Sequence, residues 1–296
     1  MALTQKNAVL KAAFFENVNL KSEDKMIKLC AFSDEAASSL TGQIQALKRN
    51  GIALIELRSV DGKNVKDLTV DESKSINQRL KDEGISVWSV GSPLGKTDIN
   101  VDFKKYLDEV KRVCELACAL STDKVRIFSF FNAYNQRNRV FDYLNEMVET
   151  SKSFGVQLYH ENEKDIYGDI CERVLDIMDN VNGLKYVYDP ANFLQVGEKA
   201  SVTLDLLHAK TDYFHIKDAI SSTGELVPAG YGDGQIKKLI EMIKDDKVLT
   251  VEPHLSVFDA YASIDNTQLK TRFVYINSNE AFDAAVSALK NLIKKD

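Results

Sequence analysis

The stretch Gly183-Leu184-Lys185-Tyr186-Val187-Tyr188-Asp189-Pro190 contains the pattern that decides the fold. It begins with a glycine, which can end a helix in the left-handed conformation without steric cost. A short run rich in apolar residues follows, without strict polar alternation, as is typical of a strand buried on both faces of a parallel sheet. Gly51, Gly84 and Gly155 hold the same position, each after an amphipathic segment and before an apolar run. The unit therefore repeats along the chain.

The apolar runs predict eight strands: Lys28–Phe32, Ala53–Leu57, Ser86–Val90, Lys124–Phe128, Gln157–His160, Lys185–Tyr188, Tyr213–Ile216 and Val248–Val251. The segments between them have helical spacing, as in Leu40–Arg49 and Tyr106–Ala119. Eight strands that alternate with helices predict an α/β protein of the (β/α)8, or TIM barrel, class. A doubly wound open sheet is the alternative. It commonly has a glycine-rich phosphate loop after its first strand, and residues 32–35 contain no glycine.

We expect a single barrel domain over residues 27–296, preceded by an N-terminal extension over residues 1–26 that is helical. Two stretches interrupt the regular alternation. One is a glycine-rich loop within residues 219–233, and the other is a long loop after strand eight, over residues 253–278. Both leave from the carboxyl ends of strands, where a barrel builds its active site. Each is therefore either a lid over a substrate or an ordinary surface insertion.

The composition limits the partners of the chain. Its 296 residues carry a net charge of −6, and its pI is about 5.4. Proteins that bind nucleic acid usually present a basic face, and no run of Lys and Arg occurs here, so we expect no nucleic-acid partner. No apolar run approaches the roughly 18 residues of a membrane span. The four cysteines form no CxxC pair, which favours a reducing compartment and predicts a cytoplasmic protein.

Four consecutive predicted strands end in a side chain that can bind a metal ion: Glu161, Asp189, His215 and Glu252. Taken singly, each has an ordinary explanation, as a solvated carboxylate, a turn residue or a structural histidine. Adjacent parallel strands lie about 4.8 Å apart, so residues at their common end can converge on one point. The coincidence at four successive strands favours a metal centre. An oxygen-rich set with one imidazole suits Mn2+ or Mg2+ and could also accept Co2+ or Zn2+.

These strand ends resemble the xylose isomerase-like TIM barrel superfamily and, within it, the sugar phosphate isomerase/epimerase family. The resemblance covers about residues 27–295. It is carried by His160-Glu161-Asn162-Glu163, Tyr188-Asp189-Pro190-Ala191-Asn192, Phe214-His215-Ile216-Lys217-Asp218 and Val251-Glu252-Pro253. It implies that Glu161, Asp189, His215 and Glu252 bind one divalent ion and that the two glutamates act as the acid/base pair. Ketose epimerases of this group commonly have a histidine where this chain has Asn192, whose amide can hydrogen-bond a sugar hydroxyl but cannot shuttle a proton.

The expected reaction is proton abstraction next to a carbonyl through a metal-stabilised enediolate. Return of the proton gives an epimer or an aldose–ketose isomer of a small carbohydrate, which is a sugar, a sugar phosphate or a keto-acid. A keto-sugar or inosose dehydratase that begins with the same enolisation is an alternative. A non-catalytic metal-containing sugar-binding protein is a second. The chain has only four histidines, which argues against the zinc-cluster endonucleases of the same superfamily. Assembly of the chain as a homodimer is left open by the sequence.

Further residues predicted to contact the substrate are Lys217, Asn192, Arg126, Glu56 and Lys96. Lys217 faces the same way as His215 by strand alternation. It could stabilise an enediolate oxygen, or pair with Asp218 or with a ligand carboxylate. Glu56 could pair with Arg58 across the barrel mouth, or with Arg126. Lys96 follows a glycine-containing loop and could supply charge to an anion, or lie in a plain loop.

Overall fold

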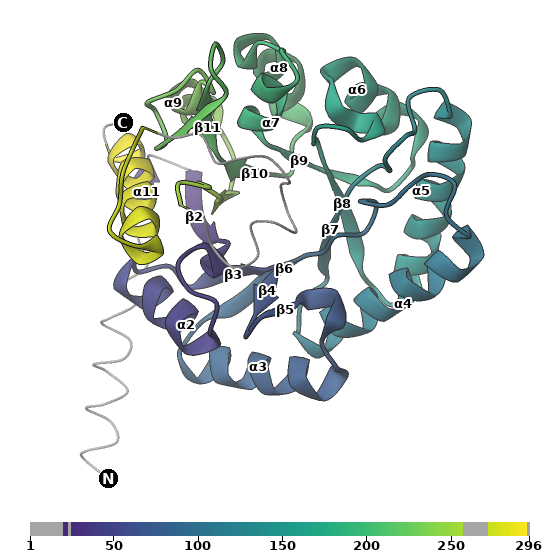
Figure 1. Cartoon of the computed structure of the whole chain (residues 1–296), viewed down its shortest axis with the longest axis horizontal. Helices are drawn as coiled ribbons and strands as arrows, with labels where there is room; N and C mark the ends of the chain where they lie inside the picture. The colour runs from purple at the N-terminus through teal and green to yellow at the C-terminus, as the bar shows by residue number, and fades with distance from the viewer. Residues whose placement is uncertain (1–19, 23–24, 257–271, 295–296) are drawn as a thin grey trace.

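The computed structural model describes residues 20–22, 25–256 and 272–294. Within them, eight parallel strands close into a barrel: β2 (Lys25–Ala31), β3 (Leu54–Leu57), β6 (Ser86–Gly91), β7 (Lys124–Ile127), β8 (Gln157–Glu161), β9 (Lys185–Tyr188), β10 (Tyr213–Ile216) and β13 (Lys247–Val251). Neighbours in this order are paired, and β13 pairs with β2 to close the ring. Helices surround the strands (Figure 1). The predicted TIM barrel is confirmed.

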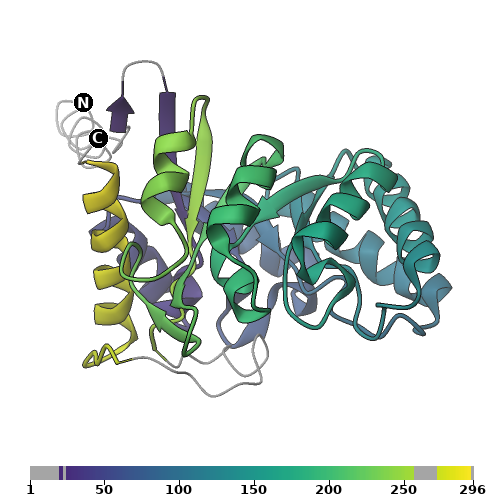
Figure 2. The ribbon, with the colours of Figure 1, turned by 90° about the horizontal axis from the view of Figure 1, so that it is seen from above.

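The longer helices run along the outside of the barrel, as the two views in Figures 1 and 2 show. They are α2 (Leu40–Arg49), α3 (Val70–Asp82), α4 (Phe103–Ala119), α5 (Arg137–Lys152), α6 (Cys171–Asn180), α7 (Pro190–Gln195), α8 (Ala200–Leu207), α9 (Ile236–Met242) and α11 (Ser278–Ile293). The helix predicted from Tyr106 begins earlier, at Phe103, because the Asp102 side chain accepts a hydrogen bond from the Lys105 backbone N–H and caps it. In the described part of the chain, no helix is long and apolar enough to cross a membrane.

Short elements complete the chain. Single 3-10 turns cover Ser33–Glu35, Val65–Asp67, Tyr167–Asp169 and His208–Lys210. Strands β4 (Ser59–Val60) and β5 (Lys63–Asn64) form a small hairpin. The glycines that precede β3, β6, β8 and β9 all have positive φ, between 59° and 84°, as their positions predict.

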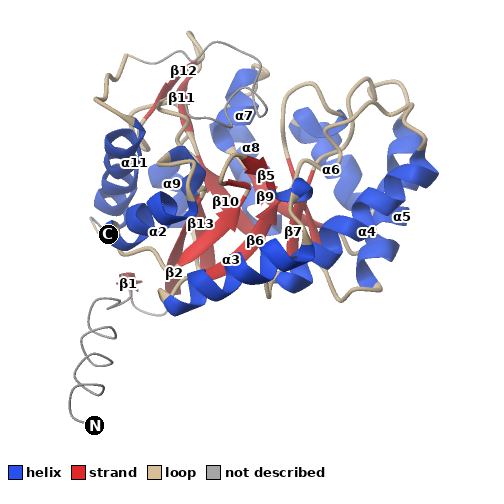
Figure 3. Cartoon of the chain, turned by 60° about the horizontal axis from the view of Figure 1, so that its bottom comes forward, coloured by secondary structure: helices blue, strands red, loops and turns tan. Residues whose placement is uncertain are grey.

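The described part of the N-terminal extension is a strand and not the expected helix. β1 (Leu20–Ser22) pairs antiparallel with β2. Strand β2 begins at Lys25, before the predicted start, because Met26 and Ile27 continue the pairing with β1 and Ile27 also pairs with β13. β1 lies at the opposite end of the barrel from the hairpin that follows β10 (Figure 3). Residues 1–19 lie outside the described residues.

The stretch after β10 is a hairpin followed by a glycine-rich turn. β11 (Asp218–Ile220) pairs antiparallel with β12 (Glu225–Val227). The buried carboxylate of Asp218 then accepts hydrogen bonds of 2.8–3.1 Å from the backbone N–H groups of Ala219, Gly230, Gly232 and Gly234. A Cβ at Gly232 would lie 2.3 Å from Asp218 Oδ1, so only glycine fits there. The long loop predicted over residues 253–278, either a lid or a surface insertion, lies largely outside the described residues.

Replacing Asp218 by Ala should therefore lower the free energy of unfolding by about 2–4 kcal/mol, because several backbone donors lose a charged acceptor. Asp218→Asn should lose less, since one carbonyl oxygen remains. Urea denaturation measures the loss, and limited proteolysis should show new cleavage within residues 228–234. Asp71→Ala, at an exposed position, is the control. Unchanged stability and unchanged cleavage in Asp218→Ala would contradict this role.

His160 shows how β8 divides its side chains between the barrel and the helices. Glu161 points into the barrel, whereas the His160 ring stacks on Tyr186, with ring centroids 6.3 Å apart. Gly168 makes room for it, since a Cβ there would lie 2.5 Å from His160 Cε1. Both ring nitrogens are buried without a hydrogen-bond partner among the described residues. Burial lowers the pKa of His160 to about 3, so the ring is neutral in the folded protein.

His160 should make the protein less stable in mild acid. Unfolded, the side chain binds a proton below about pH 6.5, whereas the folded protein does not until about pH 3. Stability is therefore lost as the pH falls through this window, by about 2 kcal/mol between pH 7 and pH 5. The His160→Leu variant lacks this group, so its free energy of unfolding should fall by about 2 kcal/mol less than that of the wild type between pH 7 and pH 5. Urea denaturation of both proteins at both pH values measures the difference. An equal loss in both proteins would refute the assignment.

Candidate metal centre

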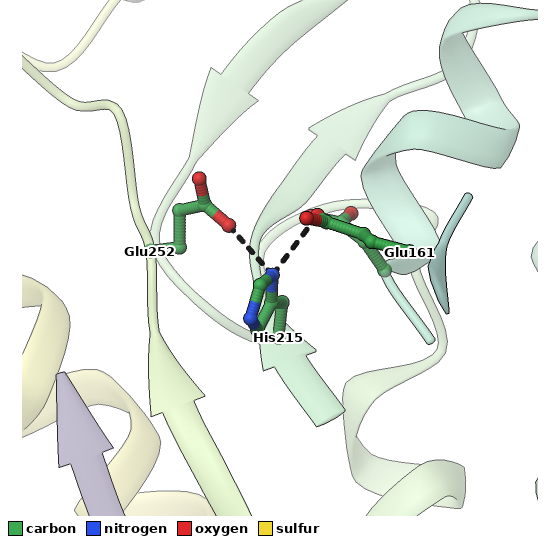
Figure 4. A group of neighbouring side chains, drawn as sticks. Glu161, His215 and Glu252 are labelled. Atoms are coloured by element: carbon green, nitrogen blue, oxygen red, sulfur yellow. Dashed lines mark hydrogen bonds and ion pairs between the residues drawn. The ribbon is translucent and has the colours of Figure 1, made fainter. Parts of the chain in front are cut away.

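Four side chains meet at the carboxyl ends of neighbouring strands. Glu161 ends β8, Asp189 and Glu252 directly follow β9 and β13, and His215 lies in β10. All four are buried, and one potential ligand atom from each lies within 4.8 Å of the others. His215 Nδ1 is 2.9 Å from Glu161 Oε1 and 3.0 Å from Glu252 Oε2 (Figure 4). The structure thus brings together the residues that the sequence predicts as metal ligands.

Asp189 combines two roles that the sequence presents as alternatives. Its Oδ1 accepts a hydrogen bond of 3.0 Å from the Asn192 backbone N–H, and it caps α7 with Pro190 at the first helical position. Its Oδ2 faces the other way and lies 3.0 Å from Lys217 Nζ. The helix cap therefore engages one oxygen of the carboxylate and leaves Oδ2 beside Lys217.

The donor set fits a divalent metal ion. Asp189 Oδ2 and Glu252 Oε2 are buried and accept no hydrogen bond of good geometry among the described residues, although a nitrogen lies 3.0 Å from each. A buried carboxylate oxygen without a donor is unfavourable. Three carboxylates and one imidazole are ligands that hard and borderline divalent ions accept. These buried acidic and histidine groups could therefore hold a metal ion.

Opposite charges compensate one another among these buried groups. Burial would lower the pKa of His215, but Glu161, Glu56 and Glu252 outweigh it and hold that pKa well above its ordinary value. Burial would likewise lower the pKa of Lys217, but its acidic neighbours, Asp189 first among them, hold that pKa well above its usual range. Burial would raise the pKa of Glu252, but Lys217 and His215 hold it well below its usual range. Burial raises the pKa of Asp189 to about 7 even beside Lys217.

Lys217 contacts a carboxylate of the group, which is one of the pairings predicted for it. Arg126 contacts another: its Nη1 lies 3.4 Å from Glu161 Oε2, and its guanidinium lies 4.4 Å from the Phe128 ring. The alternative pair between Arg126 and Glu56 is wrong, because Arg126 pairs with Glu161 and the Glu56 oxygens contact other side chains. Gly91 leaves the space for this arrangement, since a Cβ there would lie 3.2 Å from Arg126 Nη2.

Glu56 does not pair with Arg58 across the barrel mouth, so that prediction is also wrong. Its Oε1 accepts a hydrogen bond from the Tyr213 hydroxyl at 3.0 Å. Its Oε2 lies 3.1 Å from His215 Nε2 and accepts from the Thr250 hydroxyl at 3.1 Å. Glu56 thus lies in the barrel interior and contacts His215 Nε2, whereas Nδ1 of the same ring contacts Glu161 and Glu252.

Arg58 instead joins a buried acidic network that the sequence analysis missed. It donates to both Asp34 oxygens at 2.9 Å and to Glu252 Oε1 at 3.0 Å, and it lies 3.3 Å from Glu35 Oε1. Glu35, Glu252 and His254 form a second group of potential ligands, but the Arg58 guanidinium lies among them. The sequence did contain a signal for this network. Asp34 and Glu35 follow the first barrel strand, and Glu161 has the same kind of position at the end of the fifth.

Asn192 contacts a member of the four-residue group, whereas Lys96 pairs with a carboxylate outside it. Asn192 Nδ2 is 3.4 Å from Glu161 Oε1 and donates to the Asn162 carbonyl oxygen at 2.9 Å. Its buried Oδ1 has no hydrogen-bond partner among the described residues. Lys96 Nζ pairs with Glu163 Oε2 at 2.9 Å and lies 4.4 Å from the Phe128 ring centroid. Contact of either residue with a substrate stays a prediction.

Comparison with known protein families identifies the family of this chain. A family model described as the xylose isomerase-like TIM barrel matches residues 44–273. The chain belongs to this family. The match includes Glu161, Asp189, His215 and Glu252, so the centre described above lies within the xylose isomerase-like barrel. Among curated protein sequences, none matches this chain significantly.

Solved structures of the same fold include enzymes with different reactions. One is the probable 3-DHS dehydratase AsbF from Bacillus anthracis, with a TM-score of 0.68, 17% identity and coverage of 90% of this chain and 99% of that one. The IOLI protein, solved with a bound zinc atom, has a TM-score of 0.68 and 17% identity, with coverage of 90% and 98%. An L-ribulose 3-epimerase has a TM-score of 0.67 and 17% identity, with coverage of 91% and 96%. At this identity the likeness shows the fold of this xylose isomerase-like barrel alone.

Proposed function

We propose that the protein is a divalent-metal-dependent isomerase or epimerase of a small sugar, sugar phosphate or keto-acid. The observation that carries the proposal is the position of two buried glutamates, Glu161 and Glu252, on either side of His215 Nδ1. They come from β8 and β13, with β9 and β10 between them. Two carboxylates so placed can flank a substrate carbon, and one can take a proton from it while the other returns one.

The remaining residues support the same chemistry. Glu161, Asp189, His215 and Glu252 would hold the ion, which would polarise a substrate carbonyl and stabilise negative charge on its oxygen. Lys217, buried beside Asp189, supplies a positive charge to the same oxygen. Asn192, beside Glu161 with a free amide oxygen, accepts a hydrogen bond from a substrate hydroxyl.

The similar structures support this proposal as analogy. One of them is an L-ribulose 3-epimerase, and another holds a zinc atom. The acid/base pair, the ion and the substrate class are each part of the proposal.

A dehydratase acting on a keto-sugar or an inosose is the second candidate, because of Asn192. Ketose epimerases that this chain resembles commonly have a histidine there, and an amide cannot transfer a proton near neutral pH. A probable dehydratase is also among the similar structures. Such an enzyme would begin with the same proton abstraction and then expel a hydroxyl group as water.

Incubation with ketoses, keto-acids and inososes in D2O tests both candidates. The protein is stripped with a chelator and reloaded with Mn2+, Mg2+, Co2+ or Zn2+. We expect the substrate to take up deuterium at carbon only when it is incubated with the reloaded protein, and mass spectrometry detects this uptake. An epimer or isomer as product supports the first candidate, and loss of water supports the second. A protein that binds no divalent ion, or that binds sugars without exchange, would contradict both.

A further inference from the structure

Glu56 is a buried carboxylate to which the proposed reaction gives no task. It lies in β3, on the opposite side of the barrel from β9, and is 1% exposed. Three side chains from two other strands surround its oxygens: Tyr213 and His215 from β10, and Thr250 from β13. A buried charge is unfavourable unless partners satisfy it, so this arrangement is specific to the carboxylate.

The hydrogen bonds assign the protons of His215. A carboxylate accepts hydrogen bonds and donates none. The Tyr213 and Thr250 hydroxyls donate to Glu56, so the nitrogen 3.1 Å from its Oε2, His215 Nε2, must carry a proton as well. The other nitrogen, Nδ1, faces Glu161 and Glu252. By the same rule Nδ1 also carries a proton without an ion, because its two neighbours are carboxylate oxygens. An ion held by Glu161 and Glu252 would displace that proton, and Glu56 would keep the remaining proton on Nε2.

The orientation of the His215 ring is set by its neighbours. The edge of the ring meets Phe32, with centroids 5.1 Å apart and planes at 81°. Tyr213 packs against it at 5.6 Å and 65°. His215 is fully buried, and a flipped ring would place a carbon where Glu56 now meets nitrogen. Packing therefore sets the ring plane, and Glu56 selects which nitrogen faces the other ligands.

We propose that Glu56 is a positioning residue that holds His215 as an Nδ1 ligand with its proton on Nε2. This replaces the substrate contact predicted for Glu56, whose oxygens are both engaged behind the imidazole. The inference rests on the proposed function, because it takes His215 to be a metal ligand. Carboxylates that orient a ligand histidine in this way typically change metal affinity by about 10–100-fold when they are replaced.

Metal affinity tests the proposal without any substrate. Binding of Mn2+ to the stripped protein is measured by competition with a chromophoric chelator. Glu56→Gln should bind Mn2+ about 10–100-fold more weakly than the wild type. Thr250→Val, of nearly equal volume, removes one hydrogen bond to the same oxygen and keeps the carboxylate, so it should change the affinity far less. Equal affinity of Glu56→Gln and the wild type would overturn the proposal.

The proton positions can be observed directly. With 15N-labelled histidine the chain gives signals from only four imidazoles, since it has four histidines, and the spectrum of His215→Gln identifies that of His215. In the Zn2+-loaded wild type we expect a protonated Nε2 and an unprotonated Nδ1. The opposite tautomer would overturn the proposal whatever the variants do. A mixture of tautomers in Zn2+-loaded Glu56→Gln would support it further.

The outcomes separate this inference from the proposed function. A wild type that binds no divalent ion overturns both. A wild type that binds the ion with the expected tautomer but catalyses no exchange overturns the proposed function alone. If Glu56→Gln does not fold, Glu56→Asp keeps the charge with a shorter side chain. The Mn2+ affinity of Glu56→Asp should lie between that of the wild type and that expected for Glu56→Gln. An affinity of Glu56→Asp equal to that of the wild type would contradict the role given to Glu56.

Discussion

Glu161→Gln and Glu252→Gln should each lower the rate of exchange between substrate carbon-bound hydrogen and solvent by about 10²–10⁴-fold. The physical reason is that an amide cannot accept the proton that a carboxylate takes from carbon. Both side chains lie within 3.0 Å of His215 Nδ1, so each variant also removes a charge from the proposed metal centre. The rates are therefore measured at saturating Mn2+, with the metal content of each variant determined in parallel.

Glu163→Gln is the matched control for these variants. Glu163 follows Glu161 by two residues at the end of β8 and is also buried, but its carboxylate pairs with Lys96 and is not part of the four-residue group. We expect its exchange rate to fall much less. Near-normal exchange in metal-loaded Glu161→Gln or Glu252→Gln would remove that glutamate from the acid/base pair.

Arg58→Met should lower the free energy of unfolding by about 3–5 kcal/mol, which is the usual effect of removing one partner from a buried ion network. Arg58 is 3% exposed and contacts Asp34, Glu35 and Glu252. Its loss leaves three buried carboxyl groups without that counter-charge. Urea denaturation of the metal-free protein measures the effect.

The loss in Arg58→Met should depend on pH in a definite direction. Burial already raises the pKa of Glu35 to about 8, and the Arg58 charge acts to lower it. A carboxyl whose pKa is higher in the folded protein than in the unfolded chain stabilises the fold at low pH and destabilises it as the pH rises through that value. The defect of Arg58→Met should therefore be larger at pH 8 than at pH 5.

Arg49→Met is the control for Arg58→Met. Arg49 pairs with Asp283 at 2.7 Å, but both side chains are more than a third exposed. Solvent screens such a pair, so the variant should lose about 0–1 kcal/mol at either pH. A similar loss in Arg49→Met and Arg58→Met would mean that the buried network has no special importance.

Much of the fold could be predicted because its signals are local. A short apolar run between amphipathic segments predicts a strand, with or without a glycine before it. Lys185–Tyr188, which follows Gly183, and Tyr213–Ile216, which follows no glycine, both have the predicted bounds. The extension before β2 could not be predicted in this way. Leu20–Ser22 forms a strand by pairing with β2, and the hydrogen bonds that define it belong to another segment.

The grouping of Glu161, Asp189, His215 and Glu252 could likewise be predicted, because parallel strands place their carboxyl ends at one end of a barrel. The sequence by itself determined the barrel and that these four side chains would meet. Only the tertiary structure decided which charge faces which: Arg58 meets Glu252 across 194 residues of chain, and Glu56 meets His215 across 159. Closure of the barrel between β13 and β2 creates such contacts, and no local pattern encodes their distances.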